Sequence, residues 1–193
     1  DLTVFEVIFH NARMRLPSDL PDHSVVQSVE KLLTQMGLAH IRDSIIGGEN
    51  VRGISGGQRK RVNIALELIT EPALLFLDEP TSGLDASSTL EVLSILHDLA
   101  EEGKTIIMTI HQPRIEAYRL LDQLILLAKG GKLAYFGPAD ATKYFEKITQ
   151  RKRGPDVNPA DFIMDMLENV QIKKTPDDWK RLYLSSPTHK QYV

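Results

Sequence analysis

The sequence predicts an α/β fold built around a parallel sheet. Three short apolar runs, at residues 73–77, 105–110 and 124–128, are each bounded by charged residues or helix breakers. Their hydrophobicity is continuous rather than alternating, which is typical of strands buried on both faces of a parallel sheet. Between the first two runs, residues 90–99 carry apolar side chains at helical spacing, and the order strand, helix, strand indicates an α/β layer.

The segment before these runs is expected to be helical. Thr3 and Glu6 have the spacing of a capping box, so they predict the start of a helix. A second helix is expected over residues 25–36, where apolar side chains recur at helical spacing and Gly37 is placed to end it. After a glycine-rich loop, residues 58–69 return to helical spacing.

The C-terminal part is expected to add one strand and several helices. Residues 132–136 predict a fourth strand, and residues 139–148 predict a helix. A basic linker rich in helix breakers follows at residues 151–155. Asn158 and Thr175, each followed by a proline, are then placed to cap two more helices.

Composition excludes several classes of protein. The 193 residues include no cysteine, which excludes a disulfide scaffold and a thiolate metal site. A net charge of −3 and a pI near 6.1 argue against a nucleic-acid binder that works by bulk positive charge. No apolar run approaches the roughly 20 residues that a membrane-spanning helix needs. The chain starts at Asp1 without an initiator methionine, so we expect it to be a piece of a longer protein.

Two adjacent carboxylates follow the first predicted strand. Asp78 and Glu79 come directly after Leu77, at the carboxyl end of a buried strand, where open α/β sheets bind ligands. One acid at such a place can hold a divalent cation while the other polarises a water. The alternative is a solvated acidic turn that only ends the strand.

Two further features suit an anionic ligand. Ser55, Gly56 and Gly57 open a predicted helix, where glycines let backbone amides approach an anion and the helix N-terminus adds partial positive charge. The serine hydroxyl can donate to a phosphate oxygen, although an ordinary glycine-rich turn with a serine cap is the alternative. His111 follows the second predicted strand and can hydrogen-bond a phosphoryl group, although a lone histidine is more often structural.

These residues carry a family resemblance. Four motifs occur in the order and spacing of ATP-binding cassette (ABC) ATPases: Ile54-Ser55-Gly56-Gly57-Gln58-Arg59 resembles the signature motif, residues 74–80 resemble a Walker B strand with its catalytic glutamate, Ser82-Gly83-Leu84-Asp85 resembles the D-loop, and His111 resembles the switch histidine.

Further motifs are similar to the White (G) subfamily, in which the ATPase domain precedes the membrane domain: Ile110-His111-Gln112-Pro113, Tyr135-Phe136-Gly137-Pro138 and Asn158-Pro159-Ala160-Asp161-Phe162. The tail from Pro176 to Val193 is similar to bacterial relatives that also carry a forkhead-associated domain.

The resemblance implies a role for each acidic residue and for the histidine. Asp78 would orient Mg²⁺, and Glu79 would position and deprotonate the attacking water. His111 would contact the γ-phosphate. These roles suit phosphoryl transfer, which needs positioning and charge neutralisation more than covalent help.

The resemblance also implies a site shared between two subunits. Ser55 and Gly57 would bind the γ-phosphate of a nucleotide held by the opposite subunit, with Gly56 and Gln58 completing the signature motif of this cofactor site. Asp85 would communicate across the interface between the two domains.

One required motif is absent. A phosphate-cradling loop has the pattern G-x-x-x-x-G-K-S/T. The only Gly-Lys-Thr is Gly103-Lys104-Thr105, but Asp98 stands where the first glycine is needed, and the triplet precedes a strand instead of opening a helix. The family's Q-loop glutamine, expected just upstream of Thr3, is also absent.

The resemblance therefore implies a partial P-loop NTPase fold of the ABC ATPase type, with a parallel sheet core, a helical signature subdomain and a C-terminal helical extension. We expect residues 1–150 to be the later part of a nucleotide-binding domain, helical over about 1–70 and with the Walker B and H-loop core over about 71–150. Residues 151–193 would form a linker and helices leading toward the membrane domain.

The implied function is ATP hydrolysis coupled to transmembrane transport, with export of a hydrophobic or lipid-like substrate. ATP and Mg²⁺ would be the cofactors. A second nucleotide-binding domain and a membrane domain after Val193 would be the partners, without nucleic acid, and the chain would lie at the cytoplasmic face of a membrane. Two alternatives stay open: a soluble ABC-type ATPase, and a non-catalytic fragment, because the chain alone is expected to be inactive without the Walker A loop.

Two groups of residues are expected to be structural only. Arg59, Lys60 and Arg61 predict a solvated helix face, with a role in nucleotide or interdomain contact as the alternative. Trp179 and Tyr183, four residues apart, are expected to pack the last predicted helix, with ligand binding as the alternative.

Overall fold

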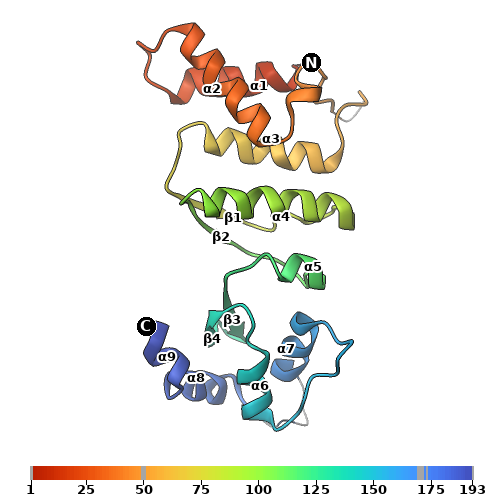
Figure 1. The fold of residues 1–193 in the computed structure, drawn as a ribbon, viewed down its shortest axis with the longest axis vertical. Helices are drawn as coiled ribbons and strands as arrows, with labels where there is room; N and C mark the ends of the chain where they lie inside the picture. Colours follow the sequence, from red (N-terminus) through yellow and green to blue (C-terminus); the bar gives the residue numbers. More distant parts are fainter. Residues whose placement is uncertain (1, 49–50, 169–171, 173, 193) are drawn as a thin grey trace. The chain divides into compact units, whose positions relative to one another are not determined.

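A computed structural model describes residues 2–48, 51–168, 172 and 174–192. The chain divides into two compact units, Asp1–His111 and Gln112–Val193. Figure 1 shows the course of the chain through both. Within the described ranges, no helix combines the length and the apolar character that crossing a membrane requires.

The first unit is mainly helical. Helix α1 packs against α2 and α3, and α3 in turn packs against α4, as Figure 1 shows. The buried apolar side chains of these helices form its core. The elements are α1 (Val4–Arg15), α2 (Asp22–Gln35), the 3₁₀ helix η1 (Ala39–Ile41), α3 (Gly56–Leu68), β1 (Leu74–Leu77), α4 (Ala86–Glu101) and β2 (Thr105–Met108).

A side-chain cap starts α1. Thr3 accepts a hydrogen bond from the backbone N–H of Glu6, while the Glu6 carboxylate accepts one from the N–H of Thr3. This reciprocal pair confirms the predicted capping box. It satisfies two backbone donors that a helix start would otherwise leave without partners.

Strands β1 and β2 pair in parallel, with Leu77 opposite Met108. The predicted parallel pairing is confirmed, but burial on both faces is not. Leu75 is 5% exposed, whereas its neighbour Phe76 is 69% exposed. Successive side chains of a strand point to opposite faces, and among the described elements α4 packs against β2. A continuous apolar run indicates that both faces of a strand are apolar. It does not indicate which of the two faces is packed against another part of this chain.

The second unit contains a β-hairpin and helices. Strand β3 pairs antiparallel with β4, so a parallel arrangement for residues 124–128 is wrong. Gly130 and Gly131, in the connection between the strands, both have positive φ, which L side chains rarely adopt and which tight hairpin turns require. The elements are α5 (Ile115–Tyr118), β3 (Gln123–Ala128), β4 (Lys132–Pro138), α6 (Thr142–Thr149), α7 (Pro159–Glu168), α8 (Pro176–Leu184) and α9 (Pro187–Tyr192).

An aromatic core holds the second unit together. Trp179 and Tyr183 of α8 are almost completely buried, which confirms their predicted packing role. The Trp179 ring lies 5.6 Å from that of Phe145 in α6, and the Tyr183 ring lies 6.2 Å from that of Tyr135 in β4. Burial raises the pKa of Tyr135 to about 12, and its hydroxyl donates to the carbonyl of Pro138 at 2.9 Å. Helix α8 is therefore fixed to both the hairpin and α6.

Two predicted caps in this unit are also confirmed. The Asn158 side-chain oxygen accepts from the N–H of Ala160, and its amide donates to the carbonyl of Pro113 at 2.8 Å. Thr175 forms a capping box with Asp178 at the start of α8. Asn158 thus both starts α7 and ties it to the segment that follows His111 in the sequence.

Candidate functional site

The two predicted acidic residues lie at the carboxyl end of β1, and a threonine at the end of β2 joins them. The Thr109 hydroxyl donates to Oδ1 of Asp78 at 2.6 Å and accepts from the backbone N–H of Glu79 at 2.9 Å. Both carboxylate residues are exposed. Since the parallel register sets Leu77 opposite Met108, Asp78 and Thr109 are the next pair along the two strands.

The backbone of Glu79 has an uncommon conformation. Its φ is +43°, in the left-handed region that non-glycine residues seldom adopt. Its N–H is bound by Thr109, and its carbonyl accepts from Nζ of Lys60 in α3 at 3.3 Å. Such conformations persist when the surroundings hold them in place, and here β2 and α3 do so from two sides.

His111 is placed two residues beyond Thr109 and is exposed. Its imidazole forms no hydrogen bond or ion pair with any residue that the structure describes. The sequence thus brings the histidine to the end of the β2 segment, but no direct bond links it to Asp78 or Glu79.

The predicted phosphate-binding motif forms the first turn of α3. The Ser55 hydroxyl accepts from the N–H of Gln58 at 3.2 Å, and the Gln58 side chain accepts from the N–H of Ser55 at 2.8 Å. A serine hydroxyl that accepts a bond still has its own hydrogen to donate. Capping the helix and donating to a phosphate are therefore compatible roles for Ser55.

The two signature glycines have different surroundings. A Cβ on Gly57 would lie 2.9 Å from Cβ of Ser88 in α4, closer than such atoms approach in proteins. A Cβ on Gly56 would meet only Cδ2 of Leu84, at an ordinary 3.5 Å. Close packing of α3 on α4 thus requires glycine at position 57. The sequence motif predicted only that this glycine would let the backbone approach an anion.

Asp85 caps α4. Its carboxylate accepts from the N–H groups of Ser87 and Ser88 at 3.1 and 3.3 Å. The side-chain and then the backbone hydrogen bonds of Ser88 hold the pKa of Asp85 below its usual value. The carboxylate is therefore charged at neutral pH and fixed at the start of α4.

The prediction of a solvated face for the basic triplet is wrong for Arg61, while Arg59 is exposed as predicted. Arg61 is buried, donates to the carbonyl of Met36 at 3.4 Å and lies 3.3 Å from the carboxylate of Glu91. Arg59 donates to the carbonyl of Ile46 at 2.9 Å. Consecutive residues of a helix point in different directions, so a run of three charges cannot occupy one face.

The carboxylates at the strand end suit a metal ion that takes most of its ligands from phosphate and water rather than from the protein. In the described part of the chain, no group of three or more histidine, aspartate or glutamate residues could hold a metal ion. Mg²⁺ is usually bound by one or two carboxylates together with phosphate oxygens and waters, so the exposed carboxylate of Asp78 fits it. Gly103 and Lys104 lie between α4 and β2, and Thr105 is the first residue of β2, so the triplet leads into a strand and does not open a helix, as predicted.

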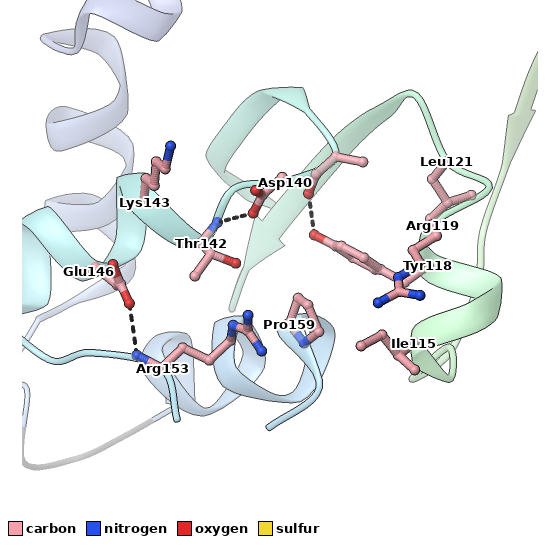
Figure 2. Close-up of a pocket in the computed structure, with 11 residues that line it drawn as sticks. Ile115, Tyr118, Arg119, Leu121, Asp140, Thr142, Lys143, Glu146, Arg153 and Pro159 are labelled. Carbon is pink, nitrogen blue, oxygen red and sulfur yellow. Dashed lines mark hydrogen bonds between the residues drawn. The ribbon is translucent and has the colours of Figure 1, made fainter. Parts of the chain in front are cut away.

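A cavity of about 510 Å³ lies in the second unit, between α5, α6 and the start of α7. Figure 2 shows its charged lining, in which Asp140 accepts from the N–H of Thr142 and Glu146 accepts from the N–H of Arg153. None of the predicted site residues lines this cavity.

Comparison with known proteins identifies the family. The profile described as "ABC transporter" matches residues 2–82, and the one described as "ABC-2 type transporter" matches residues 111–192. ABC transporter G family member 28 of Arabidopsis thaliana is 49% identical over 173 residues, which are 88% of this chain. The chain is a homologue of the G-family ABC transporters. A second relative, the broad substrate specificity ATP-binding cassette transporter ABCG2 of Bos taurus, is 45% identical over 86% of this chain.

The fold comparison agrees with this family. A solved structure described as an inward-facing conformation of a metal-chelate type ABC transporter matches with a TM-score of 0.58 and 28% identity, over 73% of this chain and 54% of that chain. The predicted ABC ATPase type of α/β fold is thereby confirmed. The chain spans only 15% and 25% of the lengths of the two curated relatives.

Proposed function

We propose that this chain is part of the ATP-binding and ATP-hydrolysing unit of a membrane transporter that exports a hydrophobic or lipid-like substrate. The observation that carries the proposal is the bonded cluster of Asp78, Glu79 and Thr109 at the ends of two parallel strands. The relatives support it, because both are transporters by name and one is described as having broad substrate specificity.

The strand-end residues would act on the terminal phosphate. Asp78 would hold Mg²⁺, which supplies positive charge to the phosphate oxygens. Glu79 would orient the attacking water and accept its proton, because its carboxylate is exposed on a backbone that two bonds hold in place. His111, exposed and without a bonded partner among the described residues, would donate to the γ-phosphate.

The start of α3 would serve a nucleotide held mainly by a second nucleotide-binding domain. The free hydroxyl hydrogen of Ser55 and the partial positive charge of a 13-residue helix both suit a γ-phosphate. Gly56, Gly57 and Gln58 would complete this surface, and Asp85 would communicate across the same interface. This arrangement needs a dimer of such domains.

The remaining parts of the transporter would lie outside this sequence. We infer that a preceding segment supplies the Walker A loop and the Q-loop glutamine, because the motifs of this sequence are those that follow these two in the family. We also infer that a membrane domain follows. Residues 1–150 would then be the later part of the nucleotide-binding domain at the cytoplasmic face, and residues 151–193 would lead toward the membrane domain. The forkhead-associated domain indicated by the tail stays a prediction.

Transport by the full-length protein tests this proposal. Inside-out vesicles that contain it should accumulate a hydrophobic dye when Mg-ATP is added, and Asp78→Asn should abolish that uptake. Asp98→Asn, an equal change at an exposed position of α4, should leave it intact. Uptake that survives in the Asp78 variant would overturn the assignment of that residue.

A calorimetric titration of the 193-residue chain tests the inferred division of the site. Because the phosphate-cradling loop is not in this sequence, the chain alone should bind Mg-ATP at most very weakly. Micromolar affinity would contradict the inference that an essential part of the site lies elsewhere.

A further inference from the structure

A threonine outside the recognised motifs holds both acidic residues of the site. We propose that Thr109 is a positioning residue, whose hydroxyl orients the Asp78 carboxylate for the metal ion and fixes the backbone that presents Glu79. This inference rests on the proposed function of those two acids.

The first part of the inference concerns the orientation of Asp78. An exposed carboxylate at a strand end can rotate about two side-chain bonds, so a metal ion that it binds must first order it. The 2.6 Å separation between Oγ1 of Thr109 and Oδ1 of Asp78 is in the range of a strong, charge-assisted bond. With Oδ1 so engaged, the carboxylate is ordered before the ion arrives, and its other oxygen is left for the ion or for its waters.

The second part concerns the backbone of Glu79. The hydroxyl that donates to Asp78 also accepts the N–H of Glu79 at 2.9 Å, so both of its polar capacities are used in compatible directions. The left-handed φ of Glu79 makes its position depend on such support. Loss of the Thr109 hydroxyl would therefore disturb the orientation of the Asp78 carboxylate and the backbone of Glu79 at the same time, because Oγ1 is bonded to both.

The role of the hydroxyl can be separated from that of the strand. The backbone N–H of Thr109 donates to the carbonyl of Leu77 at 3.0 Å, and this bond does not depend on the side chain. Valine has the shape of threonine but cannot donate or accept a hydrogen bond, whereas serine retains the hydroxyl. The pair Thr109→Val and Thr109→Ser thus distinguishes hydrogen bonding from shape.

The test uses the full-length protein and a readout that does not need hydrolysis. Mn²⁺ binding in the presence of ATP is measured by electron paramagnetic resonance, next to the Mg²⁺ dependence of the ATPase rate. Thr109→Val should weaken Mn²⁺ binding about tenfold and raise the Mg²⁺ concentration for half-maximal rate to a similar extent, because groups that orient a metal ligand typically have effects of this size. Thr109→Ser should stay within about twofold of the wild type, since it keeps the bond. Thr105→Val, at an exposed position of the same strand, should change neither value.

The outcomes separate this inference from the proposed function. A wild-type protein that binds no Mn²⁺ with ATP overturns both. A wild type that binds and hydrolyses normally, together with a Thr109→Val variant that matches it, overturns the positioning role alone. Equal defects in the valine and serine variants would assign the effect to packing and also refute the role. If the valine variant does not fold, Thr109→Ala is measured against the serine variant in the same way.

Discussion

The strand ends of the first unit and the aromatic core of the second use their side chains in opposite ways. At the strand ends, the side chains of Asp78 and Glu79 are exposed. Thr109 donates to the Asp78 carboxylate and accepts from the Glu79 N–H, and Lys60 donates to the Glu79 carbonyl. In the second unit, Trp179 is buried against other rings. Ordered but accessible groups suit chemistry, whereas buried groups supply stability, so substitutions in the two places should have different consequences.

The largest effect on stability is expected in the aromatic core. Trp179→Ala removes the ring that packs against Phe145 and should cost about 3–5 kcal/mol in the free energy of unfolding, because a large cavity is left behind. Phe76→Ala, at a ring that is 69% exposed in β1, should cost under about 1 kcal/mol. Denaturant unfolding followed by far-ultraviolet circular dichroism measures both, and equal losses would erase the contrast between the regions.

A smaller effect is expected where α3 meets α4. Gly57→Ala should destabilise the chain by about 1–3 kcal/mol, because the added methyl group would overlap Ser88. Gly56→Ala, one residue earlier, is the matched control. An added methyl group there would meet only Leu84 at an ordinary distance, so the change should be neutral or slightly stabilising. Thermal unfolding measures the difference, and adding Ser88→Gly to the Gly57 variant should recover the loss. A failure to recover would mean that glycine at 57 is needed for some other reason.

The smallest effect is expected at the cap of α8. Hydrogen bonds from Thr175, first from its side chain, lower the pKa of Asp178 to about 2. Because the folded pKa lies below the unfolded value of about 3.9, the folded chain binds fewer protons, and the stability from this group is present above about pH 4 and is lost toward pH 2. The melting temperature of Asp178→Asn should therefore be below that of the wild type at pH 5, and the gap should narrow as the pH falls.

Asp156→Asn, in an exposed loop, is the control for this titration. It should give the same small difference from the wild type at each pH. A gap between Asp178→Asn and the wild type that widens on acidification would contradict the capping interpretation of Asp178.

Local features of the fold could be predicted from sequence because each depends on residues close in the chain. The capping box at Thr3, the cap followed by proline at Thr175 and the serine cap given as an alternative for Ser55 each involve residues within one turn, and a hydrogen bond within that turn decides them. The parallel pairing of β1 and β2 could also be predicted, since a helix separates the two strands.

Features that depend on distant partners could not be predicted in this way. The partner of residues 124–128 was missed, although Gly130 and Gly131 are the signal for a hairpin. The burial of Arg61 depends on Met36 and Glu91, which are 25 and 30 positions away along the sequence. Thr109 belongs to no recognised motif, and only the register of β1 against β2 brings its hydroxyl to Asp78.

Direct comparison of ATP binding and ATP hydrolysis in one full-length variant tests the central claim, that the end of β1 is where the terminal phosphate is attacked. Glu79→Gln keeps the shape of the side chain but removes its capacity to accept a proton, while Glu101→Gln makes the same change at the end of α4. We predict that the Glu79 variant binds ATP as the wild type does and loses steady-state hydrolysis, while the Glu101 variant keeps both. Unchanged turnover in the Glu79 variant would contradict the account.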